Sequence, residues 1–166
     1  MTPIRKTIIV LGAGPAGLSI GYELTRRAVD FVILEKGKVA GESFSHYPRN
    51  IFFGPWLNNT LPGSRIAWSW RLKRSTQPAY TWYLGQYARH YNLPIDFERE
   101  VIRVDREGEL FRVETSQGVY LCQFLVNCSG YFSTPNIPHY PGQLNSSLTF
   151  MHSQSYRDSR DLQQRL

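Results

Sequence analysis

Cysteine is scarce in this sequence, and long apolar runs are missing. The two cysteines, Cys122 and Cys128, lack CxxC spacing, which argues against a zinc site or an active redox disulfide and indicates a reduced, cytoplasmic setting. No apolar run approaches the length of a membrane span. The sequence therefore favours a cytoplasmic protein without a metal ion or a membrane-spanning segment.

Long runs of one charge are also missing. Nineteen Lys and Arg exceed thirteen Asp and Glu, giving a net charge of +6, but the basic residues are scattered, with local pairs at Arg26-Arg27 and Lys73-Arg74. Because no basic run with interleaved aromatic residues stands out, nucleic acid is not an expected partner. With 42% hydrophobic and 19% charged residues, the 166 residues suit one globular domain, 1–166, with a sizeable core.

What is present is a strand–turn–helix–strand pattern over Thr7–Glu35. Thr7–Leu11 is a continuous apolar and β-branched run, as expected for a buried parallel strand. The glycine turn Gly12–Gly17 follows at once. A helix is expected to about Arg27, and Phe31–Leu34 is the second strand.

Each glycine of this turn has a chemical reason. Gly12 allows the tight turn, Gly14 lets a pyrophosphate approach the backbone, and Gly17 lets the helix lie close to the sheet. Pro15 pre-sets a helical φ, and the N–H groups of the helix start, where Ala16 lies, face the phosphates.

Glu35 ends the second strand, where an acidic side chain accepts hydrogen bonds from ribose hydroxyls, and Lys36 follows it. The agreement of strand, turn, helix and acid predicts dinucleotide binding. The alternative is a plain βαβ unit in which Glu35 is a solvated acid at the end of a strand.

The rest of the chain alternates short strands with one clear helix. Three-to-four spacing predicts a helix over Ala79–Tyr91, whereas Asn50–Ser64 is predicted to be irregular. A meander occupies about 100–124, and Leu125–Cys128 is predicted to be a further buried strand that ends in Ser129-Gly130. Aromatic residues concentrate between Phe44 and Tyr91, which indicates either a ring-lined ligand face or an aromatic core.

These elements favour an α/β fold, a Rossmann-like doubly wound domain whose parallel sheet carries an inserted antiparallel β-meander. Right-handed crossovers would bring the Gly12 turn and the Ser129-Gly130 turn together at the carboxyl edge of the sheet. A ligand at that edge would touch both turns. The backbone of Val101 is expected near the adenine end of such a ligand.

Several motifs, in this order, resemble the FAD-binding lobe of flavin-containing monooxygenases and their Baeyer–Villiger relatives. The GAGPAG turn, an acid and a meander precede VNCSGYFSTPNIPHYPG, in which Cys128, Ser129 and Gly130 are similar to the family's second flavin signature. Gly41–Phe44 resembles a turn that contacts the flavin, and 152–157 resembles the end of the monooxygenase fingerprint.

The resemblance implies a flavin that NADPH reduces and that transfers oxygen to a small-molecule substrate. It places Asn58 or Asn59 near the flavin ring and His152 near an interlobe cleft, although an Asx-turn and a structural histidine are the alternatives. Together with the reasoning above, it gives the expected cofactor contacts: Gly12, Gly14, Pro15, Ala16, Gly17, Glu35, Lys36, Ser43, Phe44, Val101, Cys128, Ser129 and Gly130.

The sequence also departs from the family pattern. Ser146 and Leu148 stand where the fingerprint begins, Phe44 replaces a tryptophan, and Ser129 replaces a threonine. No second GxGxxG for NADPH follows His152. The chain therefore looks like the first lobe of a two-dinucleotide flavoprotein, and a full catalytic cycle is not expected from it alone.

Two other functions stay open on the sequence. The glycine turn and Glu35 permit a nicotinamide-binding dehydrogenase-type domain as readily as a flavoprotein. A non-catalytic nucleotide-binding module with an exposed aromatic surface is the other, and it predicts self-association or docking of a separate NADPH-binding lobe.

Overall fold

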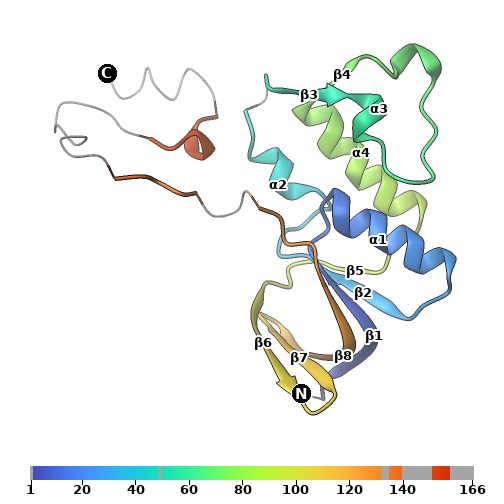
Figure 1. Ribbon diagram of the computed structural model, residues 1–166, viewed down its shortest axis with the longest axis vertical. Coiled ribbons are helices and arrows are strands. Elements are labelled where there is room, and N and C mark those ends of the chain that lie inside the picture. Colours follow the sequence, from blue (N-terminus) through green and yellow to red (C-terminus); the bar gives the residue numbers. More distant parts are fainter. Residues whose placement is uncertain (1, 49, 132–134, 140–150, 158–166) are drawn as a thin grey trace.

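A six-stranded mixed sheet forms the centre of the protein. The computed structural model describes residues 2–48, 50–131, 135–139 and 151–157. The sheet order is β5 (Ile95–Asp96), β2 (Phe31–Leu34), β1 (Ile4–Leu11), β8 (Gly118–Asn127), β7 (Leu110–Thr115) and β6 (Val101–Glu107) (Figure 1). The first four strands run parallel, and β7 and β6 continue the sheet in antiparallel fashion. The predicted Rossmann-like α/β fold with a meander is confirmed.

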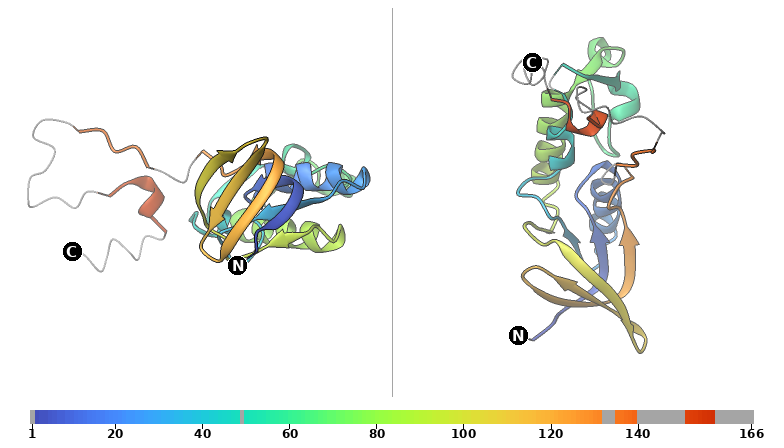
Figure 2. Two further views of the ribbon diagram at one scale, coloured as in Figure 1. Left: turned by 90° about the horizontal axis from the view of Figure 1, so that it is seen from below. Right: turned by 90° about the vertical axis from the view of Figure 1, so that its left-hand side faces the viewer.

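The two faces of the parallel strands are covered by different elements. Alternate residues of β2 belong to two separate cores, with Phe31 and Ile33 in one and Val32 and Leu34 in the other. Helices α1 (Pro15–Arg26) and α4 (Gln77–His90) cover the first face, and the meander strands contribute to the core on the second (Figures 1 and 2). Burial on both sides explains why the second half of β1, from Ile8 to Leu11, and all of β2 are apolar without alternation.

Strand β8 differs from its prediction because it is one strand where two were expected. It pairs with β1 from Tyr120 to Asn127, and its first residues, Gly118 to Cys122, pair with β7 as well. No Gly, Pro or other turn-forming residue lies at Phe124 or Leu125, so nothing in the sequence interrupts the strand at that point. The meander is therefore a direct continuation of the parallel sheet.

Residues 43–95, which we call the aromatic segment, contain more regular structure than predicted. After α2 (Glu42–Ser45) come β3 (Phe52–Pro55), α3 (Trp56–Asn59), the 3₁₀ turn η1 (Trp68–Trp70), β4 (Arg74–Thr76) and α4. The prediction of an irregular stretch over Asn50–Ser64 was wrong, because β3 pairs antiparallel with β4, about twenty residues further along the chain. Helix α4 is confirmed with slightly earlier bounds than Ala79–Tyr91.

The apolar face of α4 carries tyrosines into the core. Tyr80, Leu84, Tyr87 and Ala88 are buried, as the three-to-four spacing predicts. Tyr87 donates a hydrogen bond from its hydroxyl to the carbonyl of Pro62 at 2.7 Å, which satisfies the polar end of a buried ring. In the described part of the chain, no helix has both the length and the apolar character needed to cross a membrane.

Candidate dinucleotide-binding site

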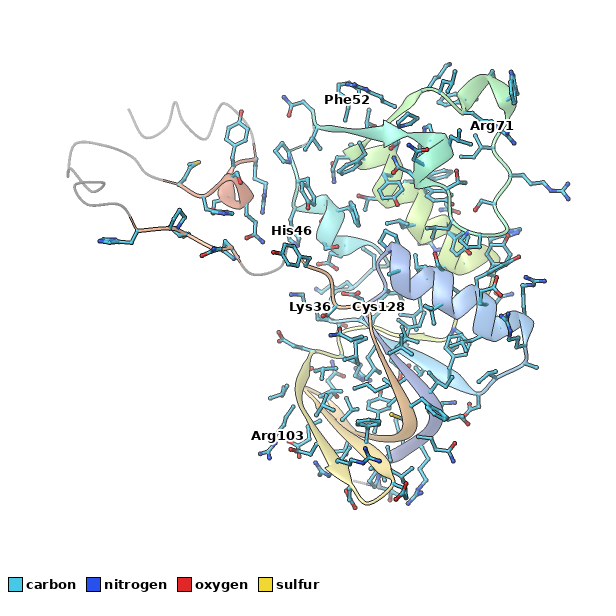
Figure 3. All side chains as sticks on the ribbon, in the orientation of Figure 1. Lys36, His46, Phe52, Arg71, Arg103 and Cys128 are labelled. Atoms are coloured by element: carbon cyan, nitrogen blue, oxygen red, sulfur yellow. The ribbon has the colours of Figure 1, made fainter. Side chains whose placement is uncertain are left out.

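The carboxyl ends of β1, β2 and β8 meet at one edge of the sheet. Leu11 is in register with Leu34 on one side and with Asn127 on the other. The residues that follow these strands, Gly12–Gly17, Glu35–Gly37 and Cys128–Gly130, are therefore neighbours, and we call them the carboxyl edge. Figure 3 shows Lys36 and Cys128 at this edge.

Two glycines of the turn are required because backbone segments approach each other closely. Gly12 has φ of +96°, and a Cβ there would lie 2.6 Å from the carbonyl oxygen of Cys128. A Cβ on Gly17 would overlap the carbonyl oxygen of Gly12 itself. The amide of Gly12 donates to the carbonyl of Leu34 at 2.8 Å, which locks the turn onto β2.

Gly14 is different, because a Cβ built on it meets no atom within 4 Å. It is the N-cap of α1, with ordinary extended backbone angles, and no acidic side chain lies in the first turn of that helix. The first intrahelical bond runs from the amide of Leu18 to the carbonyl of Gly14, so the amides of Ala16 and Gly17 precede it and have no partner within the helix. Open space, free amides and the positive end of the helix dipole together suit a phosphate group.

Glu35 is held at this edge by backbone amides. Its carboxylate accepts hydrogen bonds from the amide of Ala13 at 2.7 Å and from the amide of Gly37 at 2.8 Å. A carboxylate has further acceptor positions, so the bonds fix its orientation and leave capacity for a hydroxyl donor. The side chain is partly buried beside the glycine turn, as a ribose-binding acid requires.

The start of the meander also reaches the carboxyl edge. The amide of Arg99 donates to the backbone carbonyl of Glu35 at 2.9 Å, and Val101 follows two residues later as the first residue of β6. Sequence reasoning proposed Val101 but missed Arg99, whose part is played by its backbone and leaves no side-chain signal.

The turn before α2 is tied to the glycine turn as well. Gly41, with φ of +73°, donates from its amide to the carbonyl of Ala13 at 2.9 Å. Ser43 follows on the exposed side of α2. The ring of Phe44 packs against those of Tyr47, Phe53 and Tyr80, at centroid distances of 5.1–5.9 Å. Ser43 is thus accessible, whereas Phe44 is largely engaged with other rings.

Cys128–Gly130, the residues after β8, form the third part of the carboxyl edge. Burial raises the pKa of the Cys128 thiol, as expected for an unreactive cysteine packed beneath a turn. Ser129 donates to the side-chain oxygen of Asn127 from both its amide, at 3.1 Å, and its hydroxyl, at 2.8 Å. Gly130 has φ of +87° and open space around it. These residues form a second small turn beside Gly12.

The three residues predicted to be catalytic are not at the carboxyl edge. Asn58 is exposed on α3, and Asn59 donates through its amide to the carbonyl of Gly54 at 2.7 Å and to the Ser75 hydroxyl at 3.0 Å. His152 accepts a hydrogen bond at Nδ1 from the amide of Gln154 at 3.1 Å, in a segment that Figure 1 shows apart from the sheet. Their catalytic roles stay predictions.

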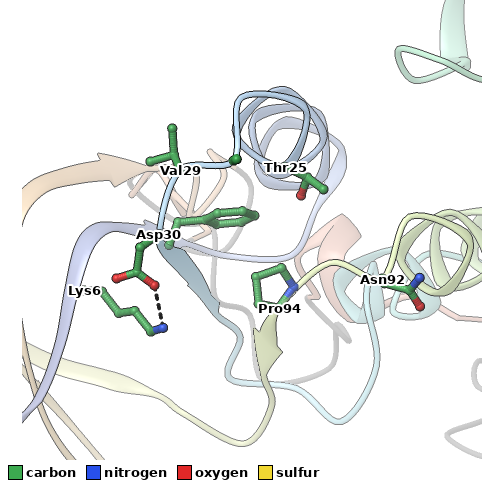
Figure 4. Close-up of a pocket in the computed structure, with 8 residues that line it drawn as sticks. Lys6, Thr25, Val29, Asp30, Asn92 and Pro94 are labelled. Carbon is green, nitrogen blue, oxygen red and sulfur yellow. Dashed lines mark hydrogen bonds and ion pairs between the residues drawn. The ribbon is translucent and has the colours of Figure 1, made fainter.

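A separate cleft of about 450 Å³ lies at the opposite, amino edge of the sheet (Figure 4). Lys6 and Asp30 line it and form an ion pair of 2.7 Å, and Thr25, Asn92 and Pro94 are among the other lining residues. Because its charges already pair with each other, and because ligands of open α/β sheets bind at the carboxyl ends of the strands, this cleft is not the candidate site.

The fold and the carboxyl edge together define a dinucleotide-binding domain of the Rossmann type. Residues 9–165 match the pyridine nucleotide-disulphide oxidoreductase family, and the chain belongs to this family. Members of the family typically bind FAD and NAD(P)H.

Several proteins of similar sequence or structure are oxidoreductases by name. The uncharacterised oxidoreductase CzcO of Bacillus subtilis (strain 168) is 34% identical over 155 residues, covering 93% of this chain and 45% of that protein. A flavin-containing monooxygenase from Stenotrophomonas maltophilia superposes with a TM-score of 0.81 and 27% identity over 93% of this chain and 47% of its own. The bacillithiol disulfide reductase Bdr from Staphylococcus aureus gives 0.75 and 26%, over 84% and 42%. The chain thus spans less than half of each of these relatives.

Proposed function

We propose that this chain is the FAD-binding lobe of an NADPH-dependent oxidoreductase of the monooxygenase type. The observation that carries the proposal is the pairing of an open Gly14 at the start of α1 with a Glu35 carboxylate held by the amides of Ala13 and Gly37. The likeness to a flavin-containing monooxygenase over nearly the whole chain supports the monooxygenase type.

Each part of the carboxyl edge takes one part of the dinucleotide. The amides of Ala16 and Gly17 bind the diphosphate, and Glu35 accepts hydrogen bonds from the adenosine ribose. Val101 contacts the adenine end, while Cys128–Gly130 flank the diphosphate on the β8 side. When bound, FAD supplies the redox chemistry, and the protein supplies position and exclusion of water. NADPH, the small-molecule substrate and the roles of Asn58, Asn59 and His152 belong to the complete enzyme.

The test compares two glycine substitutions that the backbone accepts equally well. Gly14→Asp places a carboxylate where the diphosphate binds, at an N-cap position that favours Asp, so α1 keeps its stability. Gly85→Ala is the matched control, because Gly85 lies within α4 and its Cβ also meets nothing within 4 Å. Flavin absorbance retained after gel filtration measures binding.

We expect the wild-type chain and Gly85→Ala to retain FAD, and Gly14→Asp to bind it more than about tenfold more weakly with an unchanged unfolding transition. Equal FAD affinity of Gly14→Asp and wild type would contradict the proposed site. A wild-type chain that retains no FAD but binds NADH tightly would instead identify a nicotinamide-binding dehydrogenase-type domain.

A further inference from the structure

The net positive charge of the protein comes from the aromatic segment. Residues 43–95 hold six of the nineteen Lys and Arg and none of the thirteen Asp and Glu. The remaining thirteen basic and thirteen acidic residues balance, so the entire formal charge of +6 lies in these 53 residues. All four tryptophans lie there too. The basic residues are scattered along the whole chain, so their positions alone do not reveal this asymmetry. It becomes visible only when the absence of acidic residues from 43–95 is taken into account.

Part of this segment is a continuous exposed surface. Every residue from Ala67 to Arg74 is exposed, including Trp68 at 83%, Trp70 at 52% and Leu72 at 81%. Leu57, at 54%, lies beside them because its amide donates to the carbonyl of Arg71 at 3.0 Å. We call Leu57 and Trp68–Arg74 the tryptophan–basic patch. Figure 3 shows Arg71 of this patch on the loop that extends away from the sheet.

Each of the two tryptophans in the patch lies against a cation. The guanidinium of Arg71 lies over the Trp68 ring, 5.2 Å from its centroid, and the ammonium of Lys73 lies 4.4 Å from the centroid of the Trp70 ring. Arg74 adds a further exposed positive charge. The patch thus alternates large apolar side chains with positive charges along one short stretch of backbone.

We propose that the tryptophan–basic patch binds the surface of an anionic lipid bilayer. Indole rings favour the interface between headgroups and acyl chains, where one side is apolar and the other is wet. Leucine side chains enter the acyl boundary, and Lys and Arg are attracted to anionic headgroups. The combination of apolar insertion and basic charge provides the two contributions that surface binding requires, without any membrane-spanning helix. This inference is independent of the cofactor.

Other occupants fit the patch less well. A symmetric contact with a second copy would bring Arg71, Lys73 and Arg74 against the same charges of the partner. A single-stranded nucleic acid would stack its bases on the rings of Trp68 and Trp70, one face of which already lies against a cation. The exposed side chains of Leu57 and Leu72 offer no stacking surface either. A lipid surface matches both the leucines and the charges.

The experiment is sedimentation of the chain with vesicles of phosphatidylcholine alone or with about 30% phosphatidylglycerol, at several salt concentrations. Tryptophan emission, and its quenching by brominated acyl chains, reports insertion of the rings. The double variant Trp68→Ser/Leu72→Ser removes apolar groups, and Arg71→Gln/Lys73→Gln removes two charges. Ile102→Ser and Arg106→Gln on β6 are the matched controls, because Ile102 is also largely exposed and Arg106 is an exposed cation beyond the patch.

We expect binding to anionic vesicles that is at least about tenfold tighter than to neutral ones and that weakens with salt. Loss of the two charges should weaken it about twentyfold, loss of the two apolar side chains about tenfold, and the controls should stay within about twofold. Absence of binding, equal binding to neutral vesicles or an effect of the controls as large as that of the patch variants would overturn the proposal. So would tighter binding of a single-stranded oligonucleotide than of the vesicles.

Discussion

The glycine turn and the aromatic segment both pack closely beside the same sheet, but through different contacts. In the glycine turn, backbone atoms of β1, α1 and β8 come so close that Gly12 and Gly17 have no space for a single methyl group. In the aromatic segment, large rings fill the space. Phe44 packs edge-on against Tyr80 at a centroid distance of 5.1 Å, and Tyr80 stacks on Tyr83 at 6.0 Å.

The two regions differ in how many residues specify their structure. The glycine turn depends on backbone geometry, so the identity of one or two residues decides it, and short-range sequence patterns reveal it. The aromatic segment depends on side-chain packing between α2, β3, α3 and α4, so many residues share the task. The tryptophan–basic patch lies in the same segment, but its side chains are exposed and contribute little to this packing.

The largest effect is expected where the backbone leaves no space. Gly17→Ala would place a Cβ inside the Gly12 carbonyl oxygen, and neither backbone segment moves without breaking the turn. We expect a loss of unfolding free energy of about 3 kcal/mol or more, or failure to fold, as judged by urea denaturation followed by circular dichroism. Gly85→Ala, in open space, should be neutral or slightly stabilising. Equal stabilities of the two variants would mean that helix α1 is not packed tightly on the turn.

A second effect concerns the rings of the aromatic segment at high pH. Burial, and to a lesser extent Tyr83, raises the pKa of Tyr80 to about 12 from its usual value near 10. The folded protein keeps this proton at pH values where the unfolded chain has lost it, so the stabilisation is complete below about pH 10 and disappears as the pH approaches 12. The loss is on the order of 2 kcal/mol.

Urea unfolding of the wild type and of Tyr80→Phe at pH 8 and pH 11.5 measures this loss. Phenylalanine has no proton to lose, so Tyr80→Phe should show a smaller decrease in stability between the two pH values than the wild type. A decrease of the same size in both proteins would show that ionisation of Tyr80 is not what alkaline conditions act on.

The smallest effect separates the two neighbouring asparagines. Asn59→Ala removes the donor to the Gly54 carbonyl and to the fully buried Ser75 hydroxyl, so we expect destabilisation by about 1–2 kcal/mol. Asn58→Ala, at an exposed position, should stay within about 0.5 kcal/mol of the wild type in the same urea titration. If instead Asn59→Ala were neutral, its amide would be free for the role near the flavin ring that the family resemblance implies.

Much of the fold was predictable because its signals are local. The apolar run before Gly12, the helix after it and the acid after Leu34 lie within thirty residues, and the structure confirms each of these elements. The carboxyl edge followed from strand direction alone. By contrast, β3 went unrecognised because its partner, β4, is distant in sequence, and β8 was divided because pairing with both β1 and β7 cannot be read from one strand.

The sequence by itself determined the glycine turn, the acid at the end of β2 and the family, because each depends on residue type at short spacing. Only the tertiary structure decided that Gly14 faces open space while Gly12 and Gly17 face backbone, since the same residue type stands at all three positions. It also decided that the amide of Asn59 is engaged by Gly54 and Ser75, and that Trp68, Trp70 and Leu72 stand exposed together. Exposure and long-range contact depend on how distant segments meet, and no local pattern carries that information.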